Sequence, residues 1–367
     1  MEKKAYTALG LMSGTSMDGV DASIIESDGQ TNYKTISNEY FQYNRDFFKS
    51  LSSLKDKIIH SKDLHSMSNE INHLEREITL FHAEISNKMI EKSKLEIDFV
   101  GFHGQTIFHN VDEMITKQLG DGNLLSQLIK RKVIYNFRQN DLKNGGEGAP
   151  LTPIYHKLLV HTLVEKNKIK VPITILNIGG IANITSINKN YEMKSQDISP
   201  GNCLIDKWIR VNSNKNIDEN GNIAKLGKID QFILKQALNN FYNKDISKKK
   251  SLDINDFDIS FAKGLSLENG AATIIEFTAN ILSKKILEND IYVCGGGRKN
   301  QFLIDAIQKK INNKIKKIDE LGIDGDFIES QAFAYLAIRS YLGLPISFPE
   351  TTGCKEVCTG GMIATNF

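Results

Sequence analysis

Residues 8–25 read ALGLMSGTSMDGVDASII, a polar turn between two short apolar segments. Residues 8–12 lack helix caps and residues 20–25 alternate, so the pattern predicts two strands joined as a hairpin. The turn combines glycines with hydroxyl side chains: Ser13, Gly14, Thr15, Ser16, Met17, Asp18 and Gly19. Glycines let a ligand approach the backbone and hydroxyls suit phosphate oxygens, so we expect a phosphate-binding turn, with an ordinary hairpin loop as the alternative. Asp18 and Asp21 could hold a hydrated Mg²⁺.

Composition bounds the class of protein. At 367 residues the chain exceeds what one core usually supports, so two α/β domains are expected. The net charge of +2 gives no electrostatic case for nucleic acid or an anionic membrane, and the lysines at 248–250 are expected in a solvated loop. No apolar run approaches the roughly 20 residues of a membrane span.

The N-terminus and the cysteines indicate a cytoplasmic protein. Lys3 and Lys4 precede an apolar run, but the run breaks at Ser13 without a cleavage site, which excludes a signal peptide. Four cysteines are scattered, so disulfides are not expected. Cys354 and Cys358 alone do not make a zinc site, which would need a second ligand pair.

Two further strands of the first half end in polar residues. Residues 97–106, IDFVGFHGQT, predict a strand with His103 and Gln105 at its tip, where open α/β sheets bind ligands; His103 capping the turn is the alternative. Residues 132–137 predict a strand that leads to Arg138, Asp141 and the glycine-rich residues 145–150. That segment is expected to close on a ligand or form a hinge, with an exposed turn as the alternative.

The second half repeats the design. Residues 173–178 predict a buried strand, Gly179 and Gly180 a turn, and residues 181–187, with Asn183, the returning strand. A third glycine run follows a further strand and precedes a helix: Gly295, Gly296, Gly297 and Asn300. Without Cβ atoms, this backbone could carry a flat adenine or ribose, with the helix N-terminus near anionic groups.

Asp197 is the candidate general base. It lies in QDISPGN, residues 196–202, where proline and glycine predict a rigid loop that exposes a carboxylate. A helix-capping aspartate is the alternative. Because the next helix is expected to begin near Asn202, Asp197 is left for catalysis.

The sequence as a whole resembles a known family. The order of two phosphate hairpins and a Gly-Gly-Gly turn is similar to the superfamily of actin, hexokinase and the heat-shock chaperone ATPases. Over nearly the whole chain, six segments resemble the anhydro-N-acetylmuramic acid kinases: GLMSGTSMDGVD, GFHGQTIFH, NFRQNDLKNGGEGAPLTP, LNIGGIANIT, DISPGNCLID and VCGGGRKN. The segment that contains Arg138 differs from the family pattern at its first residue, which is Asn136 here and usually aspartate in the family. The role of that position is therefore open.

The resemblance implies two related ribonuclease H-like lobes facing across a cleft. We expect residues 1–130 in the first lobe, joined by the tail at about 345–367, and residues 131–344 in the second. Members of the family use ATP and water to convert 1,6-anhydro-N-acetylmuramic acid, a cell-wall turnover product, to N-acetylmuramic acid 6-phosphate. The partners would then be this sugar and ATP with Mg²⁺, with no nucleic acid or membrane, and the oligomeric state is open, a homodimer included.

The resemblance also assigns residues. It implies Asp197 as catalytic base and Glu329 as a second acid at the sugar, although Glu329 alone resembles a first-turn glutamate stabilising a helix dipole. ATP contacts are expected at Gly14, Thr15, Ser16, Met17, Asp18, Gly19, Val20, Asp21, Gly179, Gly180, Asn183, Gly295, Gly296, Gly297 and Asn300. Sugar contacts are expected at His103, Gln105, Arg138, Asp141 and Asn202.

One carboxylate can suffice for this chemistry. A glycosidase needs a second carboxyl group to protonate the leaving oxygen, but here the leaving oxygen is the sugar's own O6. If the γ-phosphoryl group of ATP captures O6, phosphorus replaces the proton. Two other readings stay open: a kinase for another sugar, and a nucleotide-switched binding protein of the actin or chaperone type. The signatures of P-loop NTPases, zinc proteases and α/β-hydrolases are absent from the sequence.

Overall fold

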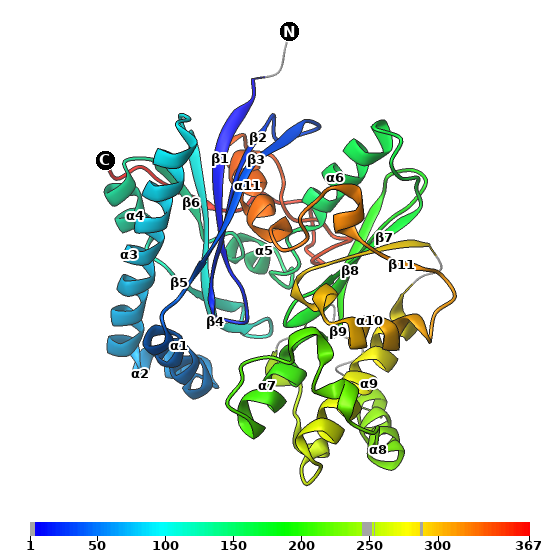
Figure 1. The fold of residues 1–367 in the computed structure, drawn as a ribbon. Helices are drawn as coiled ribbons and strands as arrows, with labels where there is room; N and C mark the ends of the chain where they lie inside the picture. Colours follow the sequence, from blue (N-terminus) through cyan, green and yellow to red (C-terminus); the bar gives the residue numbers. More distant parts are fainter. Residues whose placement is uncertain (1–3, 244–251, 253, 287–288) are drawn as a thin grey trace. The chain divides into compact units, whose positions relative to one another are not determined.

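The computed structural model describes residues 4–243, 252, 254–286 and 289–367, which form two compact α/β units (Figure 1). Unit 1 contains the described residues of Met1–Ile169 and Phe327–Phe367, and unit 2 contains those of Lys170–Asp326. The lysines at 248–250 lie outside the described residues. Among the described helices, none combines the length and apolar character that crossing a membrane requires.

Unit 1 is built on a mixed sheet with the order β12-β6-β4-β1-β2-β3, and β5 pairs with β4. β1 pairs antiparallel with β2 and parallel with β4, and β4 pairs parallel with β6. The predicted hairpin of residues 8–25 is therefore confirmed. The strands are β1 (Tyr6–Ser13), β2 (Gly19–Ser27), β3 (Tyr33–Gln42), β4 (Phe99–Asn110), β5 (Ile115–Leu119), β6 (Lys132–Tyr135) and β12 (Met362–Ala364).

Helices cover both faces of this sheet. α1, α3 and α4 bury apolar side chains against Val20, Ala22 and Ile24 of β2 and their neighbours, whereas α11 packs on the opposite face (Figure 1). The helices of unit 1 are α1 (Arg45–Lys57), α2 (Ser61–Ser66), α3 (Ser68–Ser93), α4 (Gly122–Ile129), α5 (Gln139–Lys143), α6 (Pro153–Glu165) and α11 (Ile328–Tyr341).

Two paired glycines bring α11 onto the sheet. Gly10 of β1 and Gly101 of β4 are partners in the parallel ladder. A Cβ atom would lie 1.9 Å from Ser330 O at Gly10 and 2.2 Å from Phe333 O at Gly101. Side chains at these positions would push the helix off the sheet.

The division of the chain differs from the expected one near residue 130. β6 is held between β4 and β12, which keeps residues 131–169 in unit 1. α11, expected in the second lobe, also belongs to unit 1. No local pattern indicates this position, because the place of the helix depends on the distant Gly10 and Gly101.

Unit 2 repeats the topology of unit 1. Its sheet has the order β11-β10-β7-β8-β9, with β7, β8 and β9 antiparallel and β7, β10 and β11 parallel. Its first strand thus lies in the middle, as β1 does in unit 1. The strands are β7 (Ile173–Ile178), β8 (Ile181–Ile187), β9 (Met193–Pro200), β10 (Asp290–Cys294) and β11 (Ile315–Lys317).

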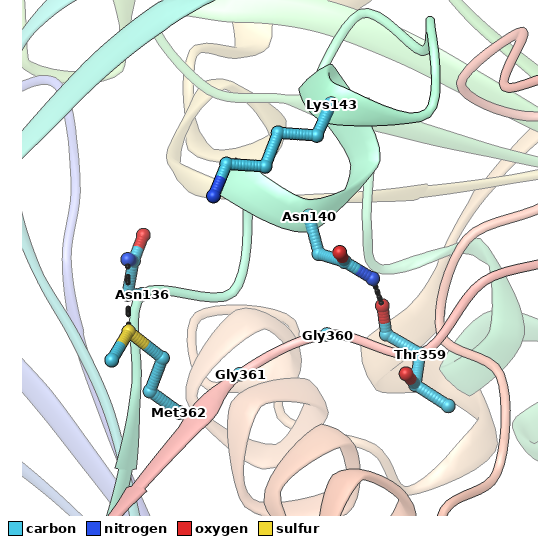
Figure 2. Close-up of a pocket in the computed structure, with 7 residues that line it drawn as sticks. All are labelled: Asn136, Asn140, Lys143, Thr359, Gly360, Gly361 and Met362. Carbon is cyan, nitrogen blue, oxygen red and sulfur yellow. Dashed lines mark hydrogen bonds between the residues drawn. The ribbon is translucent and has the colours of Figure 1, made fainter.

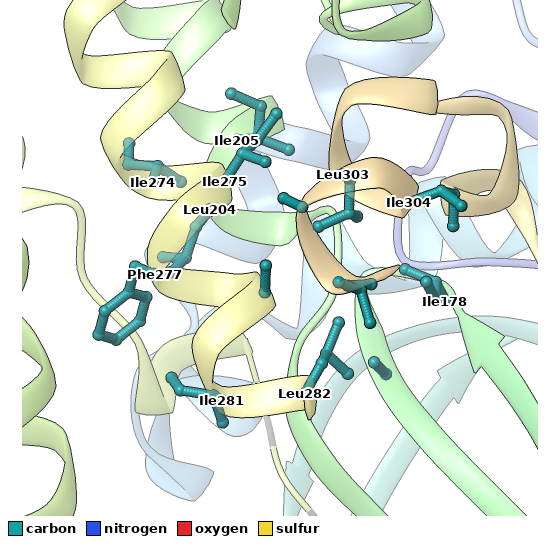
Figure 3. Close-up of a cluster of buried hydrophobic side chains, with 14 of the residues drawn as sticks. Ile178, Leu204, Ile205, Ile274, Ile275, Phe277, Ile281, Leu282, Leu303 and Ile304 are labelled. Atoms are coloured by element: carbon teal, nitrogen blue, oxygen red, sulfur yellow. The ribbon is translucent and has the colours of Figure 1, made fainter. Parts of the chain in front are cut away.

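One face of this second sheet carries the core of unit 2. Ile178 of β7 packs with side chains from three helices, among them Leu204, Ile275 and Leu303 (Figure 3). The helices of unit 2 are α7 (Cys203–Asn212), α8 (Gln231–Asn243), α9 (Leu267–Lys285) and α10 (Gln301–Gln308). The shared order of a three-stranded antiparallel meander followed by two parallel strands is that of the ribonuclease H-like fold, so the predicted α/β fold class is confirmed.

Candidate active site

The first glycine turn is held by side chains from the strand beside it. Ser13 Oγ donates to Gln105 Oε1 at 2.6 Å and also lies 3.1 Å from Tyr43 Oη. Gln105 Nε2 donates to Gly14 O at 3.0 Å. Both Ser13 and Gln105 are 1% exposed. Gln105, expected at the sugar, is therefore positioned to brace the turn.

Two carboxylates of this hairpin surround one hydroxyl. Asp18 accepts from Ser16 Oγ at 2.5 Å at the exposed end of the turn, and Asp21 pairs with Tyr40 across β2 and β3. Burial and the negative charges of Asp18 and Asp21 raise the pKa of Tyr40. Both carboxylates therefore lie near Tyr40, and carboxylate oxygens are the ligands that a hard divalent cation prefers.

Two residues of the expected nucleotide segment point into the core. Met17 and Val20 are 9% and 0% exposed and pack in the cluster beneath α3. Met17 adopts φ 58°, so the turn reverses sharply there. Only the backbone of these two residues is placed to meet a ligand, whereas Thr15 and Ser16 are exposed.

His103 and Arg138 form a second polar group in unit 1. His103 Nδ1 lies 2.7 Å from Gly104 O, which can only accept, so Nδ1 carries the proton. Nε2 then accepts from Arg138 Nε at 3.1 Å and Nη2 at 3.0 Å, and Arg138 Nη1 donates to Gly148 O at 2.8 Å. Burial and the Arg138 charge hold the pKa of His103 well below its usual value, so His103 is a neutral acceptor that orients Arg138.

The expected strand tip at His103 is wrong. β4 continues to Asn110, and Gln105 pairs with Leu119 of β5. The glycine at 104 reads as a strand end in the sequence, but it takes φ +73° within the strand, where a Cβ atom would lie 2.2 Å from Leu119 O. Glycine here reflects a close approach of strands.

Asp141 holds the glycine-rich segment and the tail of the chain. Its Oδ2 accepts from Gly148 N at 2.6 Å and its Oδ1 from Thr352 Oγ1 at 2.6 Å. Asp141 is 1% exposed and lies beside Cys354 and Cys358. Burial raises the pKa of both thiols, that of Cys358 to about 12, with the Asp141 carboxylate adding to the effect. Among residues 145–150 only Gly145 is exposed, so the segment is largely packed, and its closing on a ligand or acting as a hinge stays a prediction.

Asn136 lines a polar pocket of about 280 Å³ (Figure 2). Its Nδ2 lies 3.4 Å from Met362 Sδ, and nearby Asn140 donates to Thr359 O at 2.6 Å. Asn136 takes φ 56°, a left-handed conformation that asparagine accepts readily. Asn136, which differs from the family pattern, therefore follows β6 directly and lies beside the tail of the chain.

Glu329 lies in the first turn of α11, as the sequence indicated. The next residue, Ser330, places its Oγ 2.6 Å from Ser23 Oγ of β2. Asp21 precedes Ser23 by two residues, so it points to the same face of the sheet. Glu329 and Asp21 therefore share the α11 face of unit 1.

The second glycine turn is held by backbone groups. Gly179 O accepts from Asn202 N at 2.8 Å, and Gly180 O accepts from Gly201 N at 2.9 Å and Cys203 N at 3.1 Å. These donors stand at the start of α7. The β7–β8 turn is therefore joined to the residues that follow Asp197.

A row of polar side chains crosses the sheet of unit 2. Asn177 of β7 pairs with Asn183 of β8, which pairs with Asp197 of β9. Residues paired across neighbouring strands point to the same face of the sheet, so these three polar side chains share one face. Leu176 and Ile184 point to the other face, where they pack against the helices. Leu252 N donates to Asp197 Oδ2 at 2.9 Å. Asn183 Oδ1 is buried and has no hydrogen-bond partner among the described residues.

Asp197 lies within β9, so the predicted loop around it is wrong. Pro200 ends the strand, and α7 begins at Cys203, close to the predicted helix start. The Pro-Gly pair predicted a rigid loop, but an edge strand such as β9 also accepts a proline at its end. The strand fixes the Asp197 backbone more firmly than a loop would.

The third glycine turn leaves space over only one of its glycines. A Cβ atom would lie 2.2 Å from Ile178 Cγ2 at Gly297 and 2.4 Å from Asn177 Oδ1 at Gly295. At Gly296 the only described atom within 4 Å is Asn202 Nδ2, at 3.9 Å. Gly296 and Asn202 thus adjoin an open position.

This third turn is braced by residues that sequence reasoning missed. Arg298 is 4% exposed and donates two hydrogen bonds to Asp319, at 2.8 and 2.9 Å, and one to Asp326. Burial opposes the charge of Arg298, but these carboxylates outweigh it and raise its pKa. Asn300, an expected ATP contact, caps α10 by accepting from Leu303 N at 3.0 Å.

Each unit therefore gathers one set of the expected residues. Unit 2 joins Gly179, Gly180, Asn183, Asp197, Asn202 and Gly296, and unit 1 joins the first turn with Asp18 and Asp21. Asn177 was also missed, although an amide within the apolar strand ITILNI is a signal that could have found it.

The strand order shared by the two units defines an α/β protein of the ribonuclease H-like type. The family model described as anhydro-N-acetylmuramic acid kinase matches residues 6–366. The chain is 54% identical to the anhydro-N-acetylmuramic acid kinase of Pelagibacter ubique, over all of both chains, and 35% identical to that of Agrobacterium fabrum, over 97% of this chain and 98% of the relative. The chain belongs to the anhydro-N-acetylmuramic acid kinase family.

Solved structures with a similar fold include the (R)-2-hydroxyglutaryl-CoA dehydratase component A of Acidaminococcus fermentans. It has a TM-score of 0.44 and 12% sequence identity, and the match covers 92% of this chain and 99% of that one.

Proposed function

We propose that this kinase opens 1,6-anhydro-N-acetylmuramic acid with water and phosphorylates its O6, giving N-acetylmuramic acid 6-phosphate. The name of its 54% identical relative supports the substrate. The observation that carries the proposal is the row in unit 2, where Asp197 stands beside Asn183, next to the second glycine turn. The enzyme would thereby recycle a cell-wall amino sugar.

In this reaction, Asp197 accepts a proton from the water that attacks C1. The C1–O6 bond breaks, O6 bonds to the γ-phosphorus of ATP, and ADP leaves. The Leu252 N–H bond to Oδ2 at 2.9 Å helps to hold the carboxylate in one orientation. A general base of this kind is worth on the order of 10²–10⁴ in rate.

Asp18 and Asp21 fit Mg²⁺, because they bring two carboxylates to the first glycine turn and the strand β2 that follows it, and hard cations prefer oxygen ligands. They would hold the cation, which neutralises charge on the phosphates when bound. Thr15 and Ser16 would donate to phosphate oxygens, and Gly296 would lie under the adenosine.

The expected sugar contacts divide into two groups. Arg138 and Asn202 are proposed to contact substrate directly, because Arg138 carries a held guanidinium and Asn202 adjoins the open position at Gly296. His103, Gln105 and Asp141 are proposed to act through others: His103 orients Arg138, Gln105 braces the first turn, and Asp141 fixes Gly148. Glu329 is proposed as the second acid at the sugar.

We also propose that the enzyme acts in the cytoplasm, which supplies ATP and keeps thiols reduced. The four cysteines form no disulfide with one another, which agrees with this location. Light scattering after size-exclusion chromatography will decide whether the protein forms a homodimer.

The proposed function is tested by ADP release with a panel of sugars in the presence of Mg²⁺. The panel contains 1,6-anhydro-N-acetylmuramic acid, 1,6-anhydro-N-acetylglucosamine, N-acetylmuramic acid, glucose and no sugar. We expect fast release with the anhydro-muramic sugar and a product of the mass of its hydrated phosphate ester. Equal turnover with no sugar would favour a nucleotide-switched protein, and preference for glucose would favour another sugar kinase.

A further inference from the structure

A cluster of metal-ligand side chains lies outside the glycine turns, where the tail of unit 1 meets α5. One ligand atom each from Asp141, Cys354 and Cys358 lies within 4.8 Å of the other two. The spacing of the two cysteines supplies only two ligands in sequence, and the fold supplies the third from α5.

Two of the three ligand residues are buried, and the third is half-buried. Asp141 and Cys354 are 1% and 2% exposed, whereas Cys358 is half-buried. Gly148 N and Thr352 Oγ1 each occupy one position on a different Asp141 oxygen, at 2.6 Å. Each oxygen keeps a further lone pair, and such outer hydrogen bonds are what orient carboxylate ligands in metal sites.

A buried hydroxyl beside the cluster lacks a partner. Ser347 and Cys358 form an antiparallel bridge, with both backbone hydrogen bonds at 3.1 Å, so their side chains point to the same side. Ser347 is 1% exposed, and its Oγ lies beside the Cys358 thiol but has no hydrogen-bond partner of good geometry among the described residues. An unpartnered polar atom at this depth is costly, and a ligand at the cluster would satisfy it.

We propose that Asp141, Cys354 and Cys358 bind a zinc ion, with Ser347 Oγ at or beside the fourth position. Two thiolates and a carboxylate suit Zn²⁺, whereas Mg²⁺ prefers oxygen ligands alone. Binding displaces the two thiol protons to solvent. The site uses none of the reacting groups of the proposed reaction.

The zinc ion would tie the tail to the segment that positions Arg138. Asp141 accepts from Gly148 N, and Gly148 O accepts from Arg138 Nη1 at 2.8 Å. Glu147 N donates to Thr352 O at 2.8 Å, which joins the same two segments again. The metal is therefore structural, and its loss loosens Arg138 without removing a catalytic group.

The test uses Co²⁺ as a spectroscopic probe on the full-length reduced protein. We expect a thiolate-to-cobalt charge-transfer band that saturates at one cobalt per chain and disappears when Zn²⁺ is added. Cys354→Ser and Cys358→Ser should abolish the band, whereas Cys203→Ser, which alters a half-buried cysteine of unit 2, should keep it. Absence of the band in the wild-type protein, or its survival when both Cys354 and Cys358 are replaced, would overturn the proposal.

A second measurement needs no variant, so it holds even if the substituted proteins fail to fold. Zinc should slow alkylation of Cys354 and Cys358 in the native wild-type protein at least tenfold, measured by peptide mass spectrometry, and leave the rate at Cys203 unchanged. Zinc should also raise the melting temperature of the wild-type protein, and a chelator should reverse the increase. Equal alkylation rates with and without zinc would refute the site.

Discussion

The two glycine turns sit at the same place in two sheets of the same strand order, yet they are held in different ways. The turn of unit 1 is braced by side chains, with Ser13 and Gln105 joining β1 to β4. The turn of unit 2 is braced by backbone groups, with Gly179 and Gly180 accepting from the start of α7. Side-chain bracing can be removed by one substitution, whereas backbone bracing cannot.

The chemistry beside the two turns differs as well. Asp18 and Asp21 give the first turn two carboxylates, which suit a cation. The second turn stands beside the neutral amides of Asn177 and Asn183 and a single carboxylate, Asp197. In the proposed reaction, the same topology would serve charge neutralisation in unit 1 and proton acceptance in unit 2. Substitutions in the two units should therefore affect different kinetic constants.

The largest effect is expected in unit 2, from Asp197→Asn. The amide keeps the shape of the side chain but cannot take the proton, so kcat should fall by on the order of 10²–10⁴ with nearly unchanged affinity for ATP and sugar. Steady-state kinetics and calorimetry measure both quantities. Asp305→Asn, an exposed change on α10, is the control and should be silent. If Asp197→Asn retains the wild-type kcat, another residue must be the general base.

The third glycine turn should show a sharp difference between neighbours. Gly296→Val should fold, because only Asn202 Nδ2 lies within 4 Å of a Cβ there, and should weaken ATP binding at least tenfold, ~1.4 kcal/mol. Gly297→Ala should instead lower the melting temperature, because its Cβ would overlap Ile178. Titration with a non-hydrolysable ATP analogue measures affinity. Unchanged affinity in folded Gly296→Val would place the adenosine elsewhere.

The bracing of the first turn is tested by Gln105→Ala. Loss of hydrogen bonds to Ser13 and Gly14, each worth about 0.5–1.5 kcal/mol, should lower kcat/KM roughly tenfold through weaker ATP binding. The control is Gln118→Ala in β5, because among the described residues the Gln118 side chain bonds to Thr106 and Thr116 and not to the turn. If the two variants behave alike, Gln105 does not position the turn.

The smallest effect is on stability, and it distinguishes the units by pH. All eight histidines lie in unit 1, between residues 60 and 161. Burial lowers the pKa of His82 and His156 to about 4, and that of His103 falls well below its usual value. The folded state then binds fewer protons than the unfolded state, so these groups cost stability as the pH falls below about 6.5.

Hydrogen exchange followed by mass spectrometry, corrected for intrinsic rates, measures this difference. Peptides of unit 1 should lose protection between about pH 7 and pH 5, and histidine titration should leave unit 2 unaffected. His82→Gln should flatten the pH dependence, whereas His73→Gln, whose side chain is 71% exposed, should leave it unchanged. Loss of protection in unit 2 first would contradict the assignment.

Much of this fold could be predicted from local sequence, and the failures share one cause. Residues 8–25 and 173–187 were correctly predicted as hairpins because apolar runs and glycine turns lie next to each other in the chain. The place of α11 was not predicted, because it depends on Gly10 and Gly101, far away in sequence. The brace formed by Arg298 with Asp319 and the cluster of Asp141 with the cysteines are likewise contacts between distant segments.

The roles of residues were harder to predict than their positions. Three residues expected to contact ATP have a structural place instead. Met17 and Val20 pack in the core, and Asn300 caps a helix. A sequence motif marks a segment whose conformation matters, and some residues of the motif only stabilise that conformation and do not contact a ligand.

The central claim is that ring opening and phosphoryl transfer are one coupled event with Asp197 as base. The direct measurement is to follow 1,6-anhydro-N-acetylmuramic acid with wild-type enzyme and Mg²⁺ in ¹⁸O-labelled water, with and without ATP. We predict one ADP per sugar opened, no ring opening without ATP, and no label in the phosphate ester, because its bridging oxygen is the sugar's own O6. Ring opening without nucleotide would show a separate hydrolytic step, and label in the ester would show that water attacks C6 instead of C1; either result would contradict the proposed reaction.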